Sequence, residues 1–186
     1  MDPRIVWPIV VVLVLAAAAA AWVLRQRRRS EHLRRRFGPE YERTIRKASD
    51  RRRAEAELAE REKRVEKIVI RPLAREDGRR FHESWLLIQR RFVDAPREAA
   101  AEADRLVNEV LRARGYPAED FEKRAEDVSV HYPHLVANYR AARAIAGRSA
   151  RNHATTEDLR KAVVYYRDLF EELLETRSPG RVGAKS

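Results

Sequence analysis

The sequence predicts an all-α protein with three parts: an N-terminal transmembrane helix, a polar juxtamembrane helix and a small cytoplasmic helical bundle. Three observations lead to this prediction. Residues 5–24 form an apolar run without a charged side chain. Beyond residue 74, apolar residues recur at spacings of three and four, the period of an amphipathic helix. No segment alternates apolar and polar residues over a convincing length, so no strand is expected.

The first element is a predicted membrane span at residues 5–24. Twenty helical residues cover about 30 Å, the thickness of the hydrocarbon core of a bilayer. Eleven of the twenty are Ile, Val or Leu, which favour insertion. Trp7 and Trp22 lie near the two ends, where indole rings prefer the interface, and both are expected to be membrane-interface anchors. A cleaved signal peptide is the alternative, because the alanine run contains candidate cleavage sites.

A block of arginines follows the apolar run directly. Basic residues tend to stay on the cytoplasmic side of a membrane, so we expect the amino terminus outside and residues 25–186 in the cytoplasm, with the protein at the cell membrane. Residues 25–53 carry thirteen Arg or Lys residues against four acidic ones, and residues 54–186 have a net charge of only +2. The excess charge therefore belongs to the membrane-proximal segment, and nucleic acid is not expected as a partner. The expected lipid-headgroup contacts are Arg25, Arg27, Arg28, Arg29, Arg34, Arg35 and Arg36.

The next elements are a basic juxtamembrane segment at 25–38 and a charged helical stalk at 39–70. The helix of the span is expected to continue through Phe37 and to stop at the strong break of Gly38 and Pro39. A single polar helix at about 39–68 should follow. Its apolar residues make only a thin stripe without a sustained heptad seam, so a coiled coil is a weaker alternative.

Residues 74–176 are predicted to form one helical bundle domain, since about 100 residues suffice for a small core. Its helices are expected near 75–92, 95–114, 118–128, 133–148 and 156–175. The first of them should place an aromatic-rich face in the core: Phe81, Trp85, Ile88 and Phe92. Three caps are expected at the boundaries: Asp94, Gly115 and the capping box of Thr155 and Asp158. Residues 177–186 are expected to be a disordered tail.

Several short blocks of this chain recur together in a group of bacterial proteins. They are Phe37-Gly38-Pro39-Glu40-Tyr41, Gln89-Arg90-Arg91-Phe92-Val93-Asp94, Ala103-Asp104-Arg105-Leu106-Val107, Arg114-Gly115-Tyr116-Pro117, Ser129-Val130, Tyr139-Arg140 and Thr156-Glu157-Asp158-Leu159-Arg160. On these blocks the chain resembles, over about residues 33–175, an uncharacterised family of bacterial single-span membrane proteins. The resemblance implies a one-span membrane protein with a helical domain. It implies no activity and transfers no functional residue.

No catalytic, metal-binding or cofactor-binding pattern stands out in the sequence. The close pair His131 and His134 lacks further ligands at metal-binding spacing, and no glycine-rich phosphate loop is present. We therefore expect a membrane-anchored scaffold or adaptor whose partners are the bilayer and an unidentified protein, with homo-oligomer formation left open. One alternative is a peripheral anionic-lipid binder that acts through the basic segment. The other is an enzyme with an unrecognised inter-helix site around Tyr139, Arg140 and His134.

Overall fold

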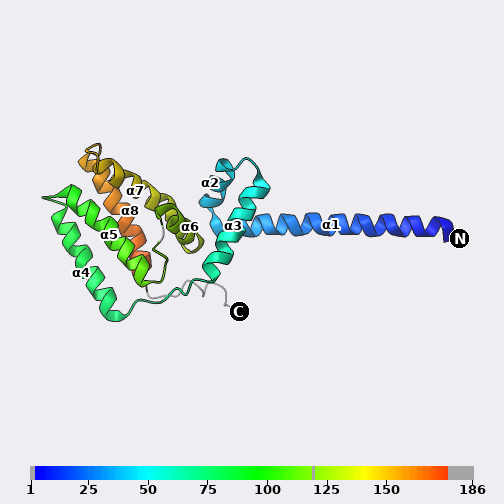
Figure 1. The fold of residues 1–186 in the computed structure, drawn as a ribbon, viewed down its shortest axis with the longest axis horizontal. Coiled ribbons are helices and arrows are strands. Elements are labelled where there is room, and N and C mark those ends of the chain that lie inside the picture. The colour runs from blue at the N-terminus through cyan, green and yellow to red at the C-terminus, as the bar shows by residue number, and fades with distance from the viewer. Residues whose placement is uncertain (1–2, 119, 176–186) are drawn as a thin grey trace. The chain divides into compact units, whose positions relative to one another are not determined.

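The computed structural model describes residues 3–118 and 120–175, with side chains from residue 12 onward, and in this part of the chain every regular element is a helix. The predicted all-α fold and helical bundle are thereby confirmed (Figure 1). The helices are α1 Pro3–Phe37, α2 Pro39–Lys47, α3 Arg51–Glu66, α4 Arg75–Arg91, α5 Pro96–Ala113, α6 Phe121–His131, α7 Val136–Ser149 and α8 Thr156–Leu174. The chain divides into two compact units, residues 1–58 and residues 59–186.

The first unit begins with the long helix α1, which ends at Phe37 as the sequence predicts. Gly38 follows with φ +48°, a left-handed conformation that glycine adopts without strain. Its amide still donates to the Arg34 carbonyl at 2.9 Å, and Pro39 then opens α2. The break therefore changes the direction of the chain within one residue.

The prediction of one continuous helix over about 39–68 is wrong. The chain leaves the helix at Ala48, whose φ of −84° and ψ of 149° are extended, and α3 begins only at Arg51. Ser49 and Asp50 occupy the break, and the Asp50 carbonyl accepts the amide of Ala54 at 3.1 Å. Short polar side chains such as these favour turns and helix starts over helix interiors. The spacing of the apolar residues on either side of the break did not indicate it.

In the part of the chain that the structure describes, no helix combines the length and the apolar character needed to cross a membrane. The side chains of residues 3–11, which include Trp7 and the first part of the predicted span at 5–24, lie outside that part. The predicted tail at 177–186 lies outside it as well.

The second unit is built around one apolar core, in which α8 packs against α5 and α7, and α4 packs against α5 (Figure 1). Phe81, Trp85 and Ile88 are buried as predicted, and Phe92 is partly buried. Trp85 stacks on Phe170 with ring centroids 4.8 Å apart, which joins α4 to α8. The 4-3-4 spacing had indicated this face because side chains at that spacing lie on one side of a helix.

Two of the three predicted caps are confirmed. Thr155 and Asp158 form a reciprocal capping box at the start of α8. Gly115, with φ +97°, ends α5 in a Schellman motif, in which Gly115 N donates to Arg112 O and Tyr116 N to Leu111 O. The prediction for Asp94 is wrong: Ala95 is the N-cap of α5 and no side chain caps the helix. A tight turn after α4 places the Asp94 amide on the Arg91 carbonyl instead.

The segment after α3 is held against the end of α5. The Arg71 amide donates to the Arg114 carbonyl at 2.8 Å. The buried Arg114 guanidinium in turn donates to the carbonyl oxygens of Leu173 at 2.8 Å and Glu175 at 3.2 Å, at the carboxyl end of α8. A positive charge at that end of a helix interacts favourably with the helix dipole. One arginine thus connects the ends of two core helices.

Candidate functional site

The basic part of α1 has a packed stripe as well as a charged surface. Gln26 and Ser30 are half-buried, and Leu33 and Phe37 are fully buried. These four positions follow a 4-3-4 spacing, so they share one side of the helix. The seven predicted headgroup-contact arginines occupy the rest of the surface and are all exposed: Arg25, Arg27, Arg28, Arg29, Arg34, Arg35 and Arg36.

The stripe meets a buried carboxylate, Glu55, which α3 contributes and which is only 3% exposed. Oε1 of Glu55 accepts the Tyr41 hydroxyl at 2.8 Å and the Arg51 Nε at 2.9 Å. Oε2 lies 3.4 Å from the amide nitrogen of Gln26. Hydrogen bonds from three helices therefore converge on one acidic side chain.

The pKa of the Glu55 carboxyl is lowered from its ordinary value. Burial acts to raise it, but hydrogen bonds from Arg51, Tyr41 and Ser30, together with the positive charge of Arg51, outweigh burial. The carboxylate is consequently ionised at neutral pH, and its charge is compensated inside the unit.

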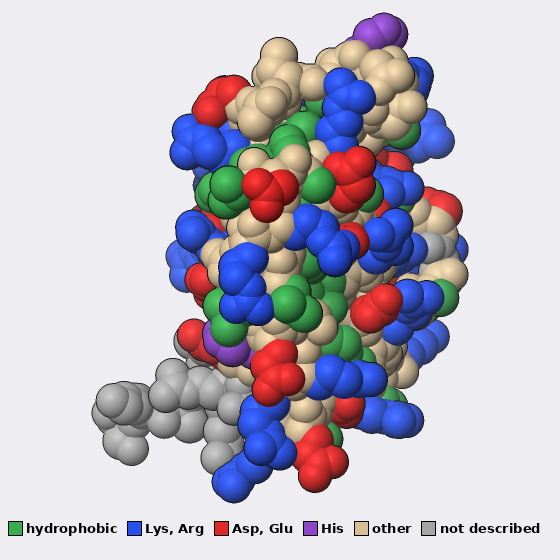
Figure 2. Space-filling model, turned by 90° about the vertical axis from the view of Figure 1, so that its left-hand side faces the viewer, with side chains coloured by type: hydrophobic (Ala, Val, Ile, Leu, Met, Phe, Trp, Pro, Cys, Tyr) green, Lys and Arg blue, Asp and Glu red, His purple; other side chains and the backbone are tan. Residues whose placement is uncertain are grey.

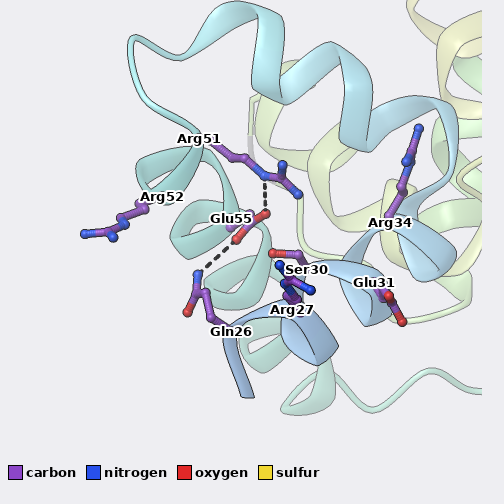
Figure 3. A pocket seen from close by; sticks show the side chains of 8 residues that line it. All are labelled: Gln26, Arg27, Ser30, Glu31, Arg34, Arg51, Arg52 and Glu55. Atoms are coloured by element: carbon purple, nitrogen blue, oxygen red, sulfur yellow. Dashed lines mark hydrogen bonds and ion pairs between the residues drawn. The ribbon is translucent and has the colours of Figure 1, made fainter. Parts of the chain in front are cut away.

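An open groove of about 380 Å³ lies over Glu55, between α1 and α3 (Figure 3). Gln26 and Arg51 point toward Glu55 from opposite sides, whereas Arg52 points away from it. The residues that line the groove are Gln26, Arg27, Ser30, Glu31, Arg34, Arg51, Arg52 and Glu55. Its lining includes four arginines and two glutamates.

Several charges of the groove are already paired. Arg51 pairs with Glu55 at 2.9 Å, Arg34 with Glu42 at 3.2 Å, and Glu31 with Arg35 at 3.8 Å. Among the described residues, no carboxylate pairs with Arg27 or Arg52. The Arg52 guanidinium instead lies 5.7 Å from the ring centroid of Trp22, in a cation–π contact. Arg52 is thus held by an aromatic ring and not by a carboxylate.

The structure separates the predicted arginines into groups. Arg27 and Arg34 line the groove over Glu55, whereas Arg25 and Arg28 lie beside Trp22 on a second shallow hollow. The residues that α3 brings to the site, Arg51, Arg52 and Glu55, were not predicted from the sequence. A signal for the α1 side was present, because Gln26 and Ser30 interrupt the arginine block in register with Leu33 and Phe37. No local pattern could have shown that α3 folds back onto them.

The second unit contains a polar network inside its helical core. Asp104, which is 8% exposed, accepts the Tyr166 hydroxyl at 2.7 Å and pairs with Arg143 at 2.7 Å. One turn further along α5, Asn108 accepts from the Tyr139 hydroxyl at 3.1 Å and from Arg124. This network joins α5 to α6, α7 and α8, and its polar groups serve as partners for one another.

An enzyme site between helices, around Tyr139, Arg140 and His134, was one alternative from the sequence. In the structure Tyr139 and Arg140 each contact another polar side chain. The Tyr139 hydroxyl lies in the core against Asn108, and burial raises its pKa to about 12. Arg140 pairs with Glu122 of α6 at 3.3 Å. A tyrosine with such a pKa is protonated at neutral pH and is a poor general base. Within the described residues no group of three or more His, Asp or Glu side chains could hold a metal ion.

Comparisons with known proteins add no relative: no family model matches the chain, and no curated protein or solved structure matches it. The resemblance to bacterial single-span membrane proteins therefore stays a prediction.

Proposed function

We propose that this protein is a membrane-anchored helical scaffold or adaptor with its bundle on the cytoplasmic face of the cell membrane. The observation that carries the proposal is the continuity of α1, one helix from Pro3 to Phe37. The apolar sequence at 5–24 and the packed stripe from Gln26 to Phe37 share this helix. An anchor continuous with a folded base would fix that base at the bilayer surface without a flexible linker.

The arginines of α1 support the same orientation. Seven of them are exposed immediately after the apolar run, where anionic headgroups attract each basic residue by about 1 kcal/mol. Trp22 is 57% exposed at the end of the apolar run, as expected for a residue in the interfacial layer. The amino terminus is then outside the cell, by the rule that basic segments stay inside.

The second unit offers a mixed surface for a binding role. Trp85 is 3% exposed and belongs to the core, so a docking surface would lie elsewhere. The face drawn in Figure 2 mixes Lys and Arg with Asp and Glu, and hydrophobic side chains show between them. Leu86 and Leu87 of α4 are exposed, at 40% and 57%, next to basic and acidic neighbours. Such a surface suits contact with a partner protein, with the α4 leucines as its apolar centre.

Anchoring and orientation are tested together by cysteine labelling, because the chain has no cysteine of its own. In intact cells a membrane-impermeant maleimide should label an Asp2→Cys variant and leave an Arg151→Cys variant unlabelled. Both should stay in the membrane pellet after alkaline carbonate extraction. Labelling of Arg151→Cys, or release of the protein by carbonate, would contradict the proposal.

The scaffold role is tested by cross-linking in cells. A photo-reactive amino acid at Leu87 should give an adduct of defined mass, and the same amino acid at the exposed Arg105 should not. An adduct of twice the mass of the chain would identify a homo-oligomer. Absence of any adduct at Leu87 would count against α4 as the contact surface.

A further inference from the structure

We propose that α4 is the contact between two copies of this chain, which pack antiparallel about a twofold axis between Leu86 and Leu87. The proposal names the partner of the scaffold at α4. It rests on the proposed function, because confinement to a bilayer raises the effective concentration of a second copy. The order of the side chains along one face of the helix supports this arrangement.

The face of α4 that points away from the core has an apolar centre. Leu86 and Leu87 are 40% and 57% exposed. Side chains three and four residues away lie on the same side of a helix, and here they are Glu83 and Arg90, which are both exposed. Figure 1 shows α4 at the edge of the second unit, beside α5. The outer face therefore has two leucines flanked by one acid and one base.

The positions of these two charges favour an antiparallel pair. Glu83 precedes Leu86 by three residues, and Arg90 follows Leu87 by three. A twofold axis between the leucines therefore brings Glu83 of one copy level with Arg90 of the other, twice in each dimer. A parallel pair would place Glu83 against Glu83 and Arg90 against Arg90, and such like-charge contacts are unfavourable.

The same symmetry holds further along the face. Arg79 precedes Leu86 by seven residues, and Asp94 follows Leu87 by seven, in the turn after α4. Both side chains are exposed. The antiparallel arrangement brings Arg79 of one copy to the end of the contact where Asp94 of the other lies. The charges of this face thus meet opposite charges of a second copy, so the face is complementary to itself.

The charges beside this face are paired within the chain, whereas those on it are not. Arg80 pairs with Asp77 at 3.0 Å, and Arg91 pairs with Glu102 of α5. In the part of the chain that the structure describes, none of the four charges named above belongs to an ion pair. They are therefore available to fix the orientation and register of a second copy, which is the main role of charges at the rim of an interface.

Disulfide cross-linking between two differently tagged full chains tests the arrangement, since the chain has no cysteine. A Glu83→Cys chain and an Arg90→Cys chain are co-expressed, and the total lysate is oxidised with copper phenanthroline. Packed helices lie about 8–10 Å apart, which leaves level Cα atoms within disulfide range. Two copies of the same variant are separated by about 10 Å along the helix. The mixed disulfide should therefore dominate.

The matched pair for chance collisions is Arg105→Cys with Glu109→Cys, two exposed positions of α5. These two chains should give little product. A mixed disulfide no more abundant than this control would overturn the proposal. Preferential linkage of two Glu83→Cys chains would also overturn it, because that product indicates a parallel contact.

Charge reversal tests the role of the ion pairs, with Leu86→Cys as the reporter of dimer formation. Glu83→Arg or Arg90→Glu should slow disulfide formation about tenfold, because two attractive pairs become repulsive. Both reversals in one chain should restore the original rate. The control reversals on α5, Arg105→Glu and Glu109→Arg, should change nothing. Equal slowing by the controls, or no restoration in the combined variant, would overturn the contact.

Failure of this proposal differs from failure of the proposed function. A photo-adduct at Leu87 with a mass other than twice that of the chain would keep the scaffold role and overturn the α4 dimer. Carbonate extraction of the same cells reports the anchor separately. Release of the chain by carbonate would overturn the anchor, whereas the mixed disulfide in total lysate would still decide the α4 contact.

Discussion

The Tyr41 hydroxyl donates to Oε1 of Glu55 at 2.8 Å, and both side chains are 3% exposed. On one straight helix, residues fourteen positions apart would be separated by about 21 Å. The bond therefore depends on the break at Ala48–Asp50, which turns α3 back toward α2. It also links the helix break to the groove, because Glu55 is one of the residues that line the groove.

A Tyr41→Phe variant should lower the free energy of unfolding of the first unit by about 1.5–3 kcal/mol, the usual contribution of a hydrogen bond to a charged group. The loss should show as faster hydrogen exchange in peptides of α2 and α3, measured on the full chain. Tyr165→Phe in α8 is the matched control, and exchange in α2 and α3 should not respond to it. Unchanged exchange in Tyr41→Phe would mean that the bond contributes nothing to the packing.

Low pH should lower the stability of the first unit. The pKa of Glu55 is lowered from its ordinary value of 4.5, so the folded unit favours the carboxylate. The resulting stability is fully present above the unfolded pKa and is lost as pH falls through the lowered folded pKa. Hydrogen exchange in α3, corrected for its intrinsic pH dependence, should lose protection below about pH 4.5. A Glu55→Gln variant should lose this pH response, and a response of unchanged size would assign it to another group.

Gly115→Ala should destabilise the second unit. Gly115 has φ +97°, and an added Cβ would lie 2.5 Å from the Val69 carbonyl oxygen. Strain of this kind costs about 1–3 kcal/mol. Gly78→Ala is the matched control, because Gly78 lies inside α4 with no atom within 4 Å of its added Cβ. That change should stabilise the helix by about 0.5–1 kcal/mol. Thermal unfolding of the two variants should therefore shift in opposite directions.

Asp104 and Tyr166 should be energetically coupled. Asp104→Ala and Tyr166→Phe each remove the 2.7 Å hydrogen bond between α5 and α8. Denaturant unfolding of the two single variants and the double variant should give a coupling energy of about 0.5–3 kcal/mol. The pair Asp104→Ala with Tyr165→Phe should be additive. Additivity in both cycles would show that the buried bond does not stabilise the bundle.

Tyr139 should titrate only in strong alkali, because burial raises its pKa to about 12. Since the folded state holds the proton more tightly than the unfolded state, the associated stability is present below pH 10 and is lost as pH rises toward 12. Phenolate absorbance should show a late phase near pH 12 that is missing in Tyr139→Phe. A normal titration of this residue near pH 10 would contradict its placement in the core.

The helices of the second unit were predictable because their signals are local. Phe81, Trp85 and Ile88 recur on one face of a single helix, and a capping box such as Thr155 with Asp158 is complete within four residues. Asp94 shows where local signals fail. The backbone turn after α4, in which the amides of Asp94 and Ala95 both donate to the Arg91 carbonyl, makes Ala95 the N-cap of α5.

The candidate groove was less predictable for a different reason. Arg27 and Arg34 could be named from the sequence, since a basic segment after an apolar run has a known meaning. No local pattern distinguishes Glu55 from the other charged residues of α3. Its burial depends on hydrogen bonds from Tyr41, Arg51 and Gln26, and these residues meet only once the chain has folded back on itself.

The amino-acid sequence by itself determined the all-α class, the helix end at Phe37 and the separation of the basic segment from a nearly neutral body. Each of these follows from the period or the charge of neighbouring residues. The tertiary structure alone decided that the stalk is two helices, that Glu55 is buried, and that Arg27 and Arg52 share a groove. Those outcomes depend on hydrogen bonds and packing between residues far apart in the chain, whose free energy has no local signature in the sequence.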